Sequence, residues 1–270
     1  MFISHALHIR SRLLCSCAAL LIFAGCAASR STRYPAATGF NLKNSDAEAV
    51  MIADEVMVKL GGWENWEKIR YVTWKFFGRR LHVWDKWTGN IRVERGDEII
   101  LMNLNTKAGR AWKGGNEITH PDSLAKPLKF GYEAWVNDSY WMFMPYKLKD
   151  SGVTLKYVRA DTMRGGRSAD ILALTFENVG VTPQNKYLIY VDKETKLVGY
   201  WDYFEKAADE KPRTSTPWTN WQQYGNILLS DERGRGKHTD LAVFDALPAS
   251  VFENPAPMDW AQLKAPAKSN

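Results

Sequence analysis

The residues with the clearest chemical potential lie in one short segment, 74–87, which reads WKFFGRRLHVWDKW. His82 stands there between two arginines and Asp85, and a histidine, which titrates near neutral pH, could act as a general base. Successive side chains of a strand point to opposite faces, so His82 and Trp84 would share one face. We therefore favour stacking or surface exposure of His82 over catalysis.

The other reactive side chains form no recognisable catalytic or metal-binding set. Asp161 with Asp170, or Asp202 with Glu205, could act as paired acids, but no motif holds either pair at a fixed distance. The sequence contains no GxSxG nucleophile motif and no glycine-rich phosphate loop. Three histidines follow the leader, none at metal-ligand spacing: His82, His120 and His238. We expect no catalytic residue, no metal, no cofactor and no enzymatic activity, because a hydrolase would need a nucleophile and a base that the sequence does not place.

All three cysteines lie near the N-terminus, at positions 15, 17 and 26. Residues 1–12 contain two arginines and no acid, and the apolar run 13–23 is shorter than the roughly 20 residues of a membrane-spanning helix. This layout is typical of a secretory signal. The residues FAGC at 23–26 resemble the lipobox of bacterial lipoproteins, with phenylalanine at the position usually held by leucine.

The lipobox resemblance implies a signal peptide over residues 1–25 and lipidation of Cys26. Stable anchoring takes more than one acyl chain, and lipoproteins resemble the multiply acylated case. Ala27 rather than aspartate follows, which in enterobacterial-type sorting implies the outer membrane, with the protein facing the periplasm. The alternative is an ordinary signal peptide cut near Ala28, which would leave a soluble periplasmic protein.

The rest of the chain divides into a tether, one domain and a tail. Residues 26–44 are mostly small, polar and aperiodic, as in a linker. Residues 45–253 are enough for one sizeable domain, and residues 254–270 predict a loosely ordered tail. The net charge of +6 is spread without a basic stripe, so we expect no nucleic-acid partner. The oligomeric state is left open.

Hydrophobic periodicity predicts an α+β domain with helices on one side of a large curved antiparallel sheet. Ser45 and Glu48 form a capping box before an amphipathic helix that ends at Gly61-Gly62. Residues 121–146 carry helical spacing and predict a central helical lid. Short turns connect about ten strands, so neighbours should pair antiparallel; the main strands are expected at 69–78, 81–87, 91–95, 98–105, 153–160, 169–177, 186–192, 197–206, 218–229 and 239–247.

Several strands are apolar on one face and aromatic on the other. A sheet with one face exposed to solvent would instead alternate apolar and polar residues along each strand. The concave face therefore has more bulky apolar residues than one short helix can cover. Either the central helical segment or a ligand must close over it. The residues expected to line such a trough are Trp74, Phe76, Trp84, Trp141, Met142 and Met144. For the WMFM run at 141–144, packing in the core is the competing interpretation.

The order of these elements, with the late hairpin NKYLIYVDKETKLVGYWDYFEK, resembles the LolA/LolB-like superfamily of outer-membrane lipoprotein carriers. Three segments resemble an uncharacterised bacterial lipoprotein family placed beside those carriers: GRRLHVWDKWTG, NDSYWMFMPYKLKDSGVTL and VGVTPQNKYLIYVDKET. This resemblance spans roughly residues 47–252, most of the mature chain. The resemblance implies an open half-barrel with a helical lid that holds acyl chains in an apolar trough. The resemblance assigns no functional residue to this chain. The chain also differs from the classical periplasmic carrier, which is soluble, because it carries an expected lipid anchor.

Two functions follow as hypotheses. The first is an envelope lipoprotein that binds a lipid or acylated ligand in the trough, in lipid or lipoprotein transport or sorting. The second is a non-catalytic glycan-binding or structural envelope module that uses exposed tryptophan and tyrosine. The first places the aromatic side chains inside a trough, whereas the second places them at the surface.

Overall fold

The computed structural model describes residues 34–258 and 263, which belong to one compact unit. The expected signal peptide, Cys26 and the first part of the expected tether lie outside the described residues, as does most of the C-terminal segment. Within the described part of the chain, no helix is both long and apolar enough to cross a membrane.

The N-terminal helix forms where its periodicity predicts. A 3-10 turn, η1 (Leu42–Asn44), leads into α1 (Ala47–Lys59). The expected capping box does not form, because the Ser45 hydroxyl donates to the carbonyl of Asn41 and accepts from the amide of Leu155. A tertiary contact has taken the place of the local one. The buried stripe of α1 is the expected one: Ala49, Ile52, Ala53, Val56 and Met57.

Gly61 ends the run of helix because its backbone has a φ of +110° and the next segment crowds it. A Cβ at this position would lie 2.2 Å from the carbonyl oxygen of Asn226. Only glycine fits such a combination of positive φ and close backbone approach. The short helix α2 (Trp63–Lys68) follows and buries Trp66.

The largest sheet has seven strands, and every neighbouring pair in it is antiparallel. Its order is β15-β1-β2-β3-β4-β5-β6, so the last long strand returns to pair with the first. The strands are β1 (Tyr71–Phe76), β2 (Arg80–Asp85), β3 (Asn90–Arg95), β4 (Glu98–Asn103), β5 (Gly109–Lys113), β6 (Asn116–Glu117) and β15 (Thr239–Phe244).

The remaining strands form a five-stranded and a three-stranded antiparallel sheet. The five-stranded sheet contains β7 (Val153–Thr162), β8 (Ser168–Phe176), β9 (Lys186–Asp192), β10 (Val198–Phe204) and β11 (Thr214–Pro217). The three-stranded sheet contains β12 (Thr219–Tyr224), β13 (Ile227–Arg233) and β14 (Gly236–Lys237).

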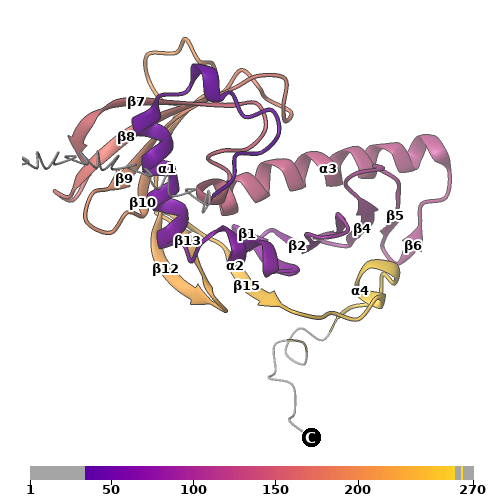
Figure 1. Ribbon diagram of the computed structural model, residues 1–270. Coiled ribbons are helices and arrows are strands. Elements are labelled where there is room, and N and C mark those ends of the chain that lie inside the picture. The colour runs from indigo at the N-terminus through magenta and orange to yellow at the C-terminus, as the bar shows by residue number, and fades with distance from the viewer. Residues whose placement is uncertain (1–33, 259–262, 264–270) are drawn as a thin grey trace, which may run out of the picture. The chain divides into compact units, whose positions relative to one another are not determined.

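The predicted α+β class with a large, curved and unclosed antiparallel sheet is confirmed. The described residues divide their fifteen strands among three sheets, where about ten strands in one sheet were expected. A physical reason is visible in Figure 1: helix α3 carries the chain away from β6 before β7 begins, and strands β7–β14 then pair among themselves, while β15 returns to β1.

The central helical segment is one long helix, α3 (Pro121–Phe143), continued by a 3-10 turn, η2 (Met144–Tyr146). Figure 1 shows α3 running along one face of the seven-stranded sheet, while the short α4 (Ser250–Glu253) lies on the other side. Gly131 lets the helix approach closely, since a Cβ there would lie 3.0 Å from Ile100 and 3.2 Å from the sulfur of Met102. The predicted helical lid is therefore present.

Both ends of the described chain are tied to the domain. Tyr34 is 1% exposed and its hydroxyl donates to the carbonyl of Tyr146. At the other end, the buried guanidinium of Arg92 donates to the carbonyls of Val251, Asn254 and Ala256. The parts of the expected tether and tail that the structure describes thus include fixed contacts with the domain.

Candidate functional site

His82 is a buried structural group that fastens α3 to strand β2. Its side chain is fully buried, its ring stacks on Trp74 at 4.6 Å and 11°, and its Nε2 lies 2.7 Å from Asp138 on α3. The favoured stacking is present, although on Trp74 of the neighbouring strand and not at the surface. Burial lowers the pKa of His82 more than the contact with Asp138 raises it, so the neutral ring donates from Nε2. The imidazole therefore has no surface open to a substrate in this structure.

Asp138 is the acceptor at the centre of this cluster. Arg80 donates to both of its carboxylate oxygens, at 2.7 and 2.8 Å, in the bidentate geometry that guanidinium groups favour. Burial alone would raise the pKa of Asp138, but hydrogen bonds from His82 and Arg80 outweigh it and hold the pKa below the ordinary value. Neither this cluster nor any other group of three or more His, Cys, Asp or Glu among the described residues could hold a metal ion.

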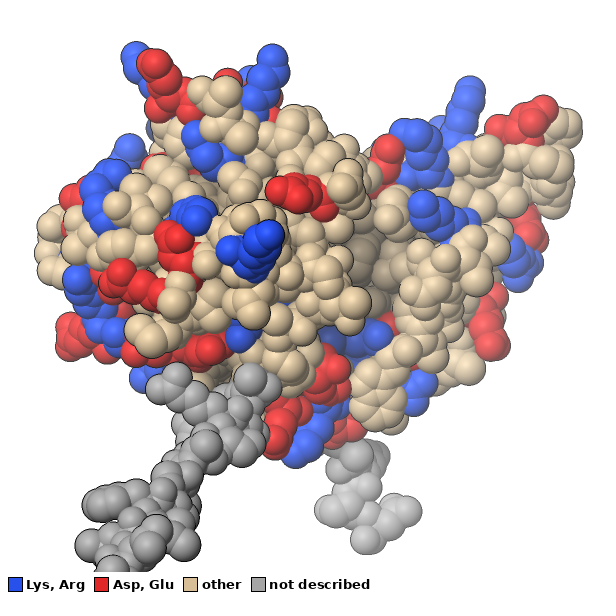
Figure 2. Space-filling view, turned by 45° about the horizontal axis from the view of Figure 1, so that its top comes forward, with Lys and Arg blue, Asp and Glu red and all other residues tan. Residues whose placement is uncertain are grey.

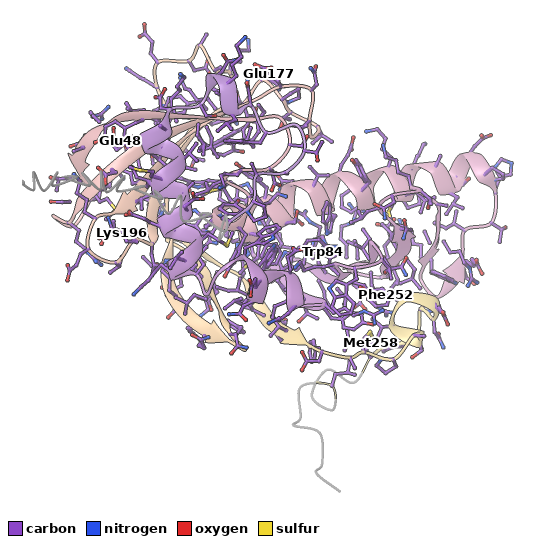
Figure 3. The ribbon with its side chains drawn as sticks, in the orientation of Figure 1. Glu48, Trp84, Glu177, Lys196, Phe252 and Met258 are labelled. Carbon is purple, nitrogen blue, oxygen red and sulfur yellow. The ribbon has the colours of Figure 1, made fainter. Side chains whose placement is uncertain are left out.

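Most of the six expected trough residues belong to the hydrophobic core. Trp74, Phe76, Met142 and Met144 are nearly or fully buried there. Trp84 is half-buried, and its ring meets Trp135 at 5.2 Å and Phe143 at 5.9 Å. Figure 3 shows Trp84 within the layer of side chains between the seven-stranded sheet and α3. Side chains of α3 thus occupy this part of the expected trough, and ligand contact by these five residues stays a prediction.

Trp141, the sixth expected residue, lines a cavity of about 440 Å³ between α3 and the five-stranded sheet. We call this cavity the aromatic pocket, because seven of its lining residues are aromatic: Tyr132, Trp135, Tyr140, Trp141, Phe176, Tyr187 and Tyr203. In the space-filling view of Figure 2, a hollow surrounded by residues other than Lys, Arg, Asp and Glu lies between the part that carries β7–β10 and the part that carries α3.

Helix α3 supplies one wall of the aromatic pocket through side chains at spacing i, i+4 and i+8, namely Tyr132, Val136 and Tyr140. The opposite wall comes from the end of β8, the start of β9, and the β8–β9 loop, which contributes Val179 and Val181. Sequence reasoning missed this wall. The VGVTPQN segment was noted only as part of a family-like motif, and its two valines were the one signal of an apolar role.

Two polar atoms of residues on the helical wall, the hydroxyl of Tyr140 and the Nε1 of Trp135, have almost no accessible surface and no hydrogen-bond partner among the described residues. A buried donor without a partner costs about 1–3 kcal/mol, so native proteins rarely leave one. Burial raises the pKa of Tyr140 well above its ordinary value, and the phenol stays protonated. The charged residues that line the pocket, Lys147 and Asp150, form an ion pair with each other.

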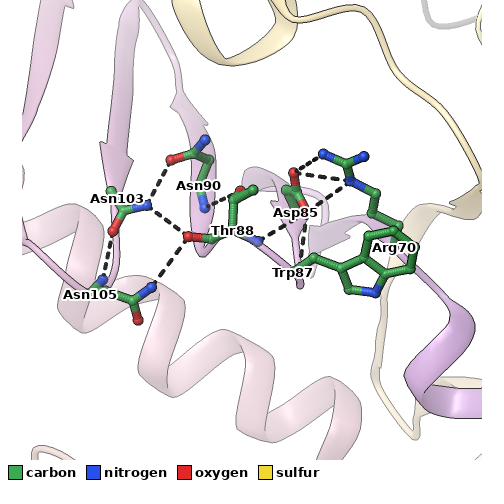
Figure 4. Close-up of polar contacts among 7 residues, drawn as sticks. All are labelled: Arg70, Asp85, Trp87, Thr88, Asn90, Asn103 and Asn105. Atoms are coloured by element: carbon green, nitrogen blue, oxygen red, sulfur yellow. Dashed lines mark hydrogen bonds and ion pairs between the residues drawn. The ribbon is translucent and has the colours of Figure 1, made fainter.

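A second cavity, of about 450 Å³, lies on the face of the seven-stranded sheet opposite α3. We call it the polar pocket. Figure 4 shows its hydrogen-bonded side chains, in which Arg70 pairs with Asp85 at 3.1 Å and Asn103 donates to Asn90 at 2.8 Å. Asp85 is almost fully buried. Burial would raise its pKa, but hydrogen bonds from Arg70 and the Thr88 region lower it.

Trp87 stands beside the polar pocket and is 62% exposed, the indole ring lying 5.2 Å from the guanidinium carbon of Arg70. Sequence reasoning did not single out Arg70 or the asparagines as a site. Their common location depends on the register that pairs Asn90 with Asn103 across a hairpin and on the loop that brings Arg70 alongside.

No family model and no curated protein matches the chain. Among solved structures it is similar to a DUF1329 family protein from Desulfovibrio piger, at 14% identity and a TM-score of 0.40, over 76% of this chain and 97% of the other. It is also similar to a LolA superfamily protein from Nitrosomonas europaea, at 8% identity and a TM-score of 0.33, over 74% of this chain and 96% of the other. These similarities transfer no ligand, partner or activity to this chain.

Proposed function

We propose that this protein is a non-catalytic envelope protein that binds a lipid or an acylated ligand in the aromatic pocket. The observation that carries the proposal is the pocket itself, whose volume of about 440 Å³ falls in the range of roughly 300–1,000 Å³ typical of small-molecule sites. Its walls are mainly aromatic and aliphatic, and its charged residues neutralise each other. Such a lining suits an apolar chain better than a charged substrate.

The energetics of chain burial support this proposal. Each buried methylene stabilises a complex by about 0.8 kcal/mol, so about ten methylenes would give useful affinity without a polar contact. Trp141, which was expected to contact ligand, lies in the pocket wall. The expected trough lay on the face that α3 covers in the seven-stranded sheet. The proposed ligand site is instead the aromatic pocket, which lies between α3 and the five-stranded sheet.

The proposal includes an address and a role. Acylation of Cys26 would anchor the chain in the outer membrane, facing the periplasm, where a pocket for acyl chains would serve lipid or lipoprotein transport or sorting. Both statements rest on the lipobox-like FAGC segment and on the resemblance to lipoprotein carriers.

The test uses the full chain carrying Cys26→Ser, so that no acyl group of its own contributes lipid. Protein prepared without detergent should carry bound lipid in native mass spectra. Val136→Trp fills the pocket from α3 and should abolish this lipid, whereas Val158→Trp, at a 40% exposed position of β7 outside the pocket wall, should retain it. Lipid-free spectra of the chain without these tryptophan changes, in repeated preparations, would contradict the proposal.

A second candidate function is glycan binding at the polar pocket. The observation that favours it is the exposed indole of Trp87 beside amide, carboxylate and guanidinium groups, since an aromatic face can stack on a sugar. Oligosaccharides should then quench tryptophan fluorescence, and Trp87→Ala should remove the quenching, whereas Leu42→Ala at another 62% exposed position should not. Quenching by lipid alone would count against this function.

A further inference from the structure

Helix α1 carries apolar side chains on its outer side as well as on its buried side. Ala47, Met51 and Val58 lie at spacing i, i+4 and i+11, which places them along one side of the helix, and all three are exposed. We call these three residues the outer stripe. A helix that packs one side on its own domain usually has a polar opposite side, so the outer stripe indicates a second apolar partner.

Exposed large hydrophobic residues are concentrated on this part of the chain. Of the six among the described residues, three lie on η1 or α1: Leu42, Met51 and Val58. Single exposed hydrophobic residues need no explanation, whereas several on one element mark a contact with a protein or a membrane. The outer surface of α1 is therefore a candidate contact surface.

The described chain begins beside this same side of α1. Asp54 lies three residues after Met51 and four before Val58, and so belongs to the side that carries the outer stripe. The Nζ of Lys149 lies 2.5 Å from the carboxylate of Asp54 and 4.5 Å from the ring centroid of Tyr34. Since Tyr34 is buried and hydrogen-bonded, it fixes the start of the described chain next to the outer stripe.

A short segment connects Tyr34 to the expected acylation site. Seven residues, 27–33, separate Tyr34 from Cys26. Even a fully extended chain spans at most roughly 3.6 Å per residue, so the acyl anchor lies within about 30 Å of Tyr34. The thirteen residues of α1 span about 20 Å. So short a connection keeps α1 close to the bilayer that holds the anchor.

The acidic side chains beside the outer stripe are paired with lysines. Asp54 pairs with Lys149 at 2.5 Å, and Glu55 pairs with Lys196 at 3.0 Å. Unpaired carboxylates would be repelled by anionic headgroups, which give a membrane surface a negative potential. Because these carboxylates are neutralised within the protein, charge does not oppose the approach of the outer stripe to a lipid surface.

We propose that the outer stripe of α1 lies against the membrane that holds the Cys26 anchor, with Met51 and Val58 in the interfacial layer of the bilayer. This rests on the proposed function, because it requires acylation of Cys26. The acyl anchor supplies the attachment, and the outer stripe fixes the orientation of the domain on the lipid surface, as the apolar side of an interfacial helix does.

The test measures the depth of single labelled sites in the acylated full chain, reconstituted into vesicles of phosphatidylethanolamine and phosphatidylglycerol. All three cysteines lie at or before position 26, and acylation blocks Cys26, so Met51→Cys or Val58→Cys gives the mature chain one free thiol for a fluorophore. Lipids with a nitroxide near the headgroup should quench either label at least roughly twofold more than a label at Asn116→Cys. Asn116 is exposed on β6, which Figure 1 shows at the end of the domain away from α1.

A second pair of variants tests whether the apolar character of the outer stripe causes this contact. With the label at position 58, Met51→Glu should lower the quenching toward that at position 116, whereas Met51→Leu should retain it. Position 51 is 56% exposed, so both substitutions should leave the Tm nearly unchanged.

The outcomes separate this inference from the proposed function. Equal quenching at positions 51, 58 and 116 of the acylated chain, or quenching that survives Met51→Glu, overturns the membrane contact and leaves acylation and lipid binding in place. A chain that carries no acyl group and does not associate with vesicles overturns the anchor and with it this inference. Labels that respond to dilution with unlabelled chain, and not to nitroxide lipid, would show that a second copy covers the outer stripe, which also overturns the membrane contact.

Discussion

Asp138 joins α3 to the seven-stranded sheet through buried hydrogen bonds. It is fully buried and accepts hydrogen bonds from Arg80 and His82 of strand β2. Removal of one member of a buried charged pair leaves the other uncompensated, which costs more than the pair contributes. Since α3 also forms a wall of the aromatic pocket, this cluster sets the position of the pocket wall.

Asp138→Ala should lower the free energy of unfolding by about 3 kcal/mol or more, because Arg80 and His82 lose their acceptor. Urea denaturation followed by circular dichroism measures the effect. Asp122→Ala, at the exposed start of the same helix, should change the stability by less than about 0.5 kcal/mol. A similar small change for both variants would contradict the role assigned to Asp138.

His238 is a second single residue with a large effect, because it makes the stability of the fold depend on pH. It is fully buried, and burial, assisted by the nearby Arg233 charge, lowers its pKa to about 3. In the unfolded chain the ring binds a proton below its ordinary pKa of about 6.5. The stabilising contribution is therefore fully present above about pH 6.5 and is lost as the pH falls toward about 3, because unfolding takes up a proton in that window.

His238→Leu removes this proton uptake. Its urea midpoint should fall less than that of the unsubstituted chain when the pH is lowered from about 7 to about 4. His120→Leu, which removes a histidine at an exposed position, is the matched control. An unchanged pH dependence in His238→Leu would show that this histidine is not the group responsible.

At the scale of elements, the β8–β9 loop closes the aromatic pocket against the start of β7. Gly152 permits the approach, with a φ of +73° and space so limited that a Cβ would lie 2.4 Å from the carbonyl oxygen of Glu177 and 2.6 Å from Val179. Because Val179 lines the pocket, the conformation of this loop and the shape of the pocket are linked.

Gly152→Ala should therefore destabilise the fold by two effects. A side chain at positive φ costs about 1–2 kcal/mol, and the clash with the loop should add at least about 1 kcal/mol. Gly166→Ala is the matched control, since Gly166 has a φ of +87° and no atom within 4 Å of the added Cβ. Urea denaturation measures the free energy of unfolding of both variants. An equal decrease in both would show that the β8–β9 loop can shift without an energetic penalty.

At the scale of the whole molecule, surface charge and the expected lipid anchor are the two features relevant to membrane attachment. Lys and Arg are interspersed with Asp and Glu over the face shown in Figure 2, without a broad patch of one sign. The proposed attachment to a membrane rests on acylation of Cys26.

Cys26→Ser should move the full chain from the membrane fraction to the soluble fraction of cell lysates, and it should remove incorporation of labelled palmitate. Cys17→Ser, inside the expected signal peptide, should leave both properties unchanged. Retention of Cys26→Ser in the membrane fraction would contradict lipid anchoring through this residue.

The sequence alone determined the features that depend on local spacing. The apolar stripe of α1, the antiparallel hairpins joined by short turns, and the helical segment at 121–146 are set by side-chain period and turn residues, and all are present. Local spacing also accounts for the stacking of His82, because the register of β1 and β2 places its ring next to that of Trp74.

Only the tertiary structure decided which aromatic residues meet other protein atoms and which line a cavity. A period of two assigns Trp74 and Phe76 to one face of β1, but it cannot say that α3 covers that face and buries both. Of the six expected ligand residues, Trp141 is the one that lines the aromatic pocket, and its neighbour Tyr140, which also lines it, was missed. The reason is physical: alternation along a strand or helix fixes direction, whereas burial depends on the segment distant in sequence that packs against it.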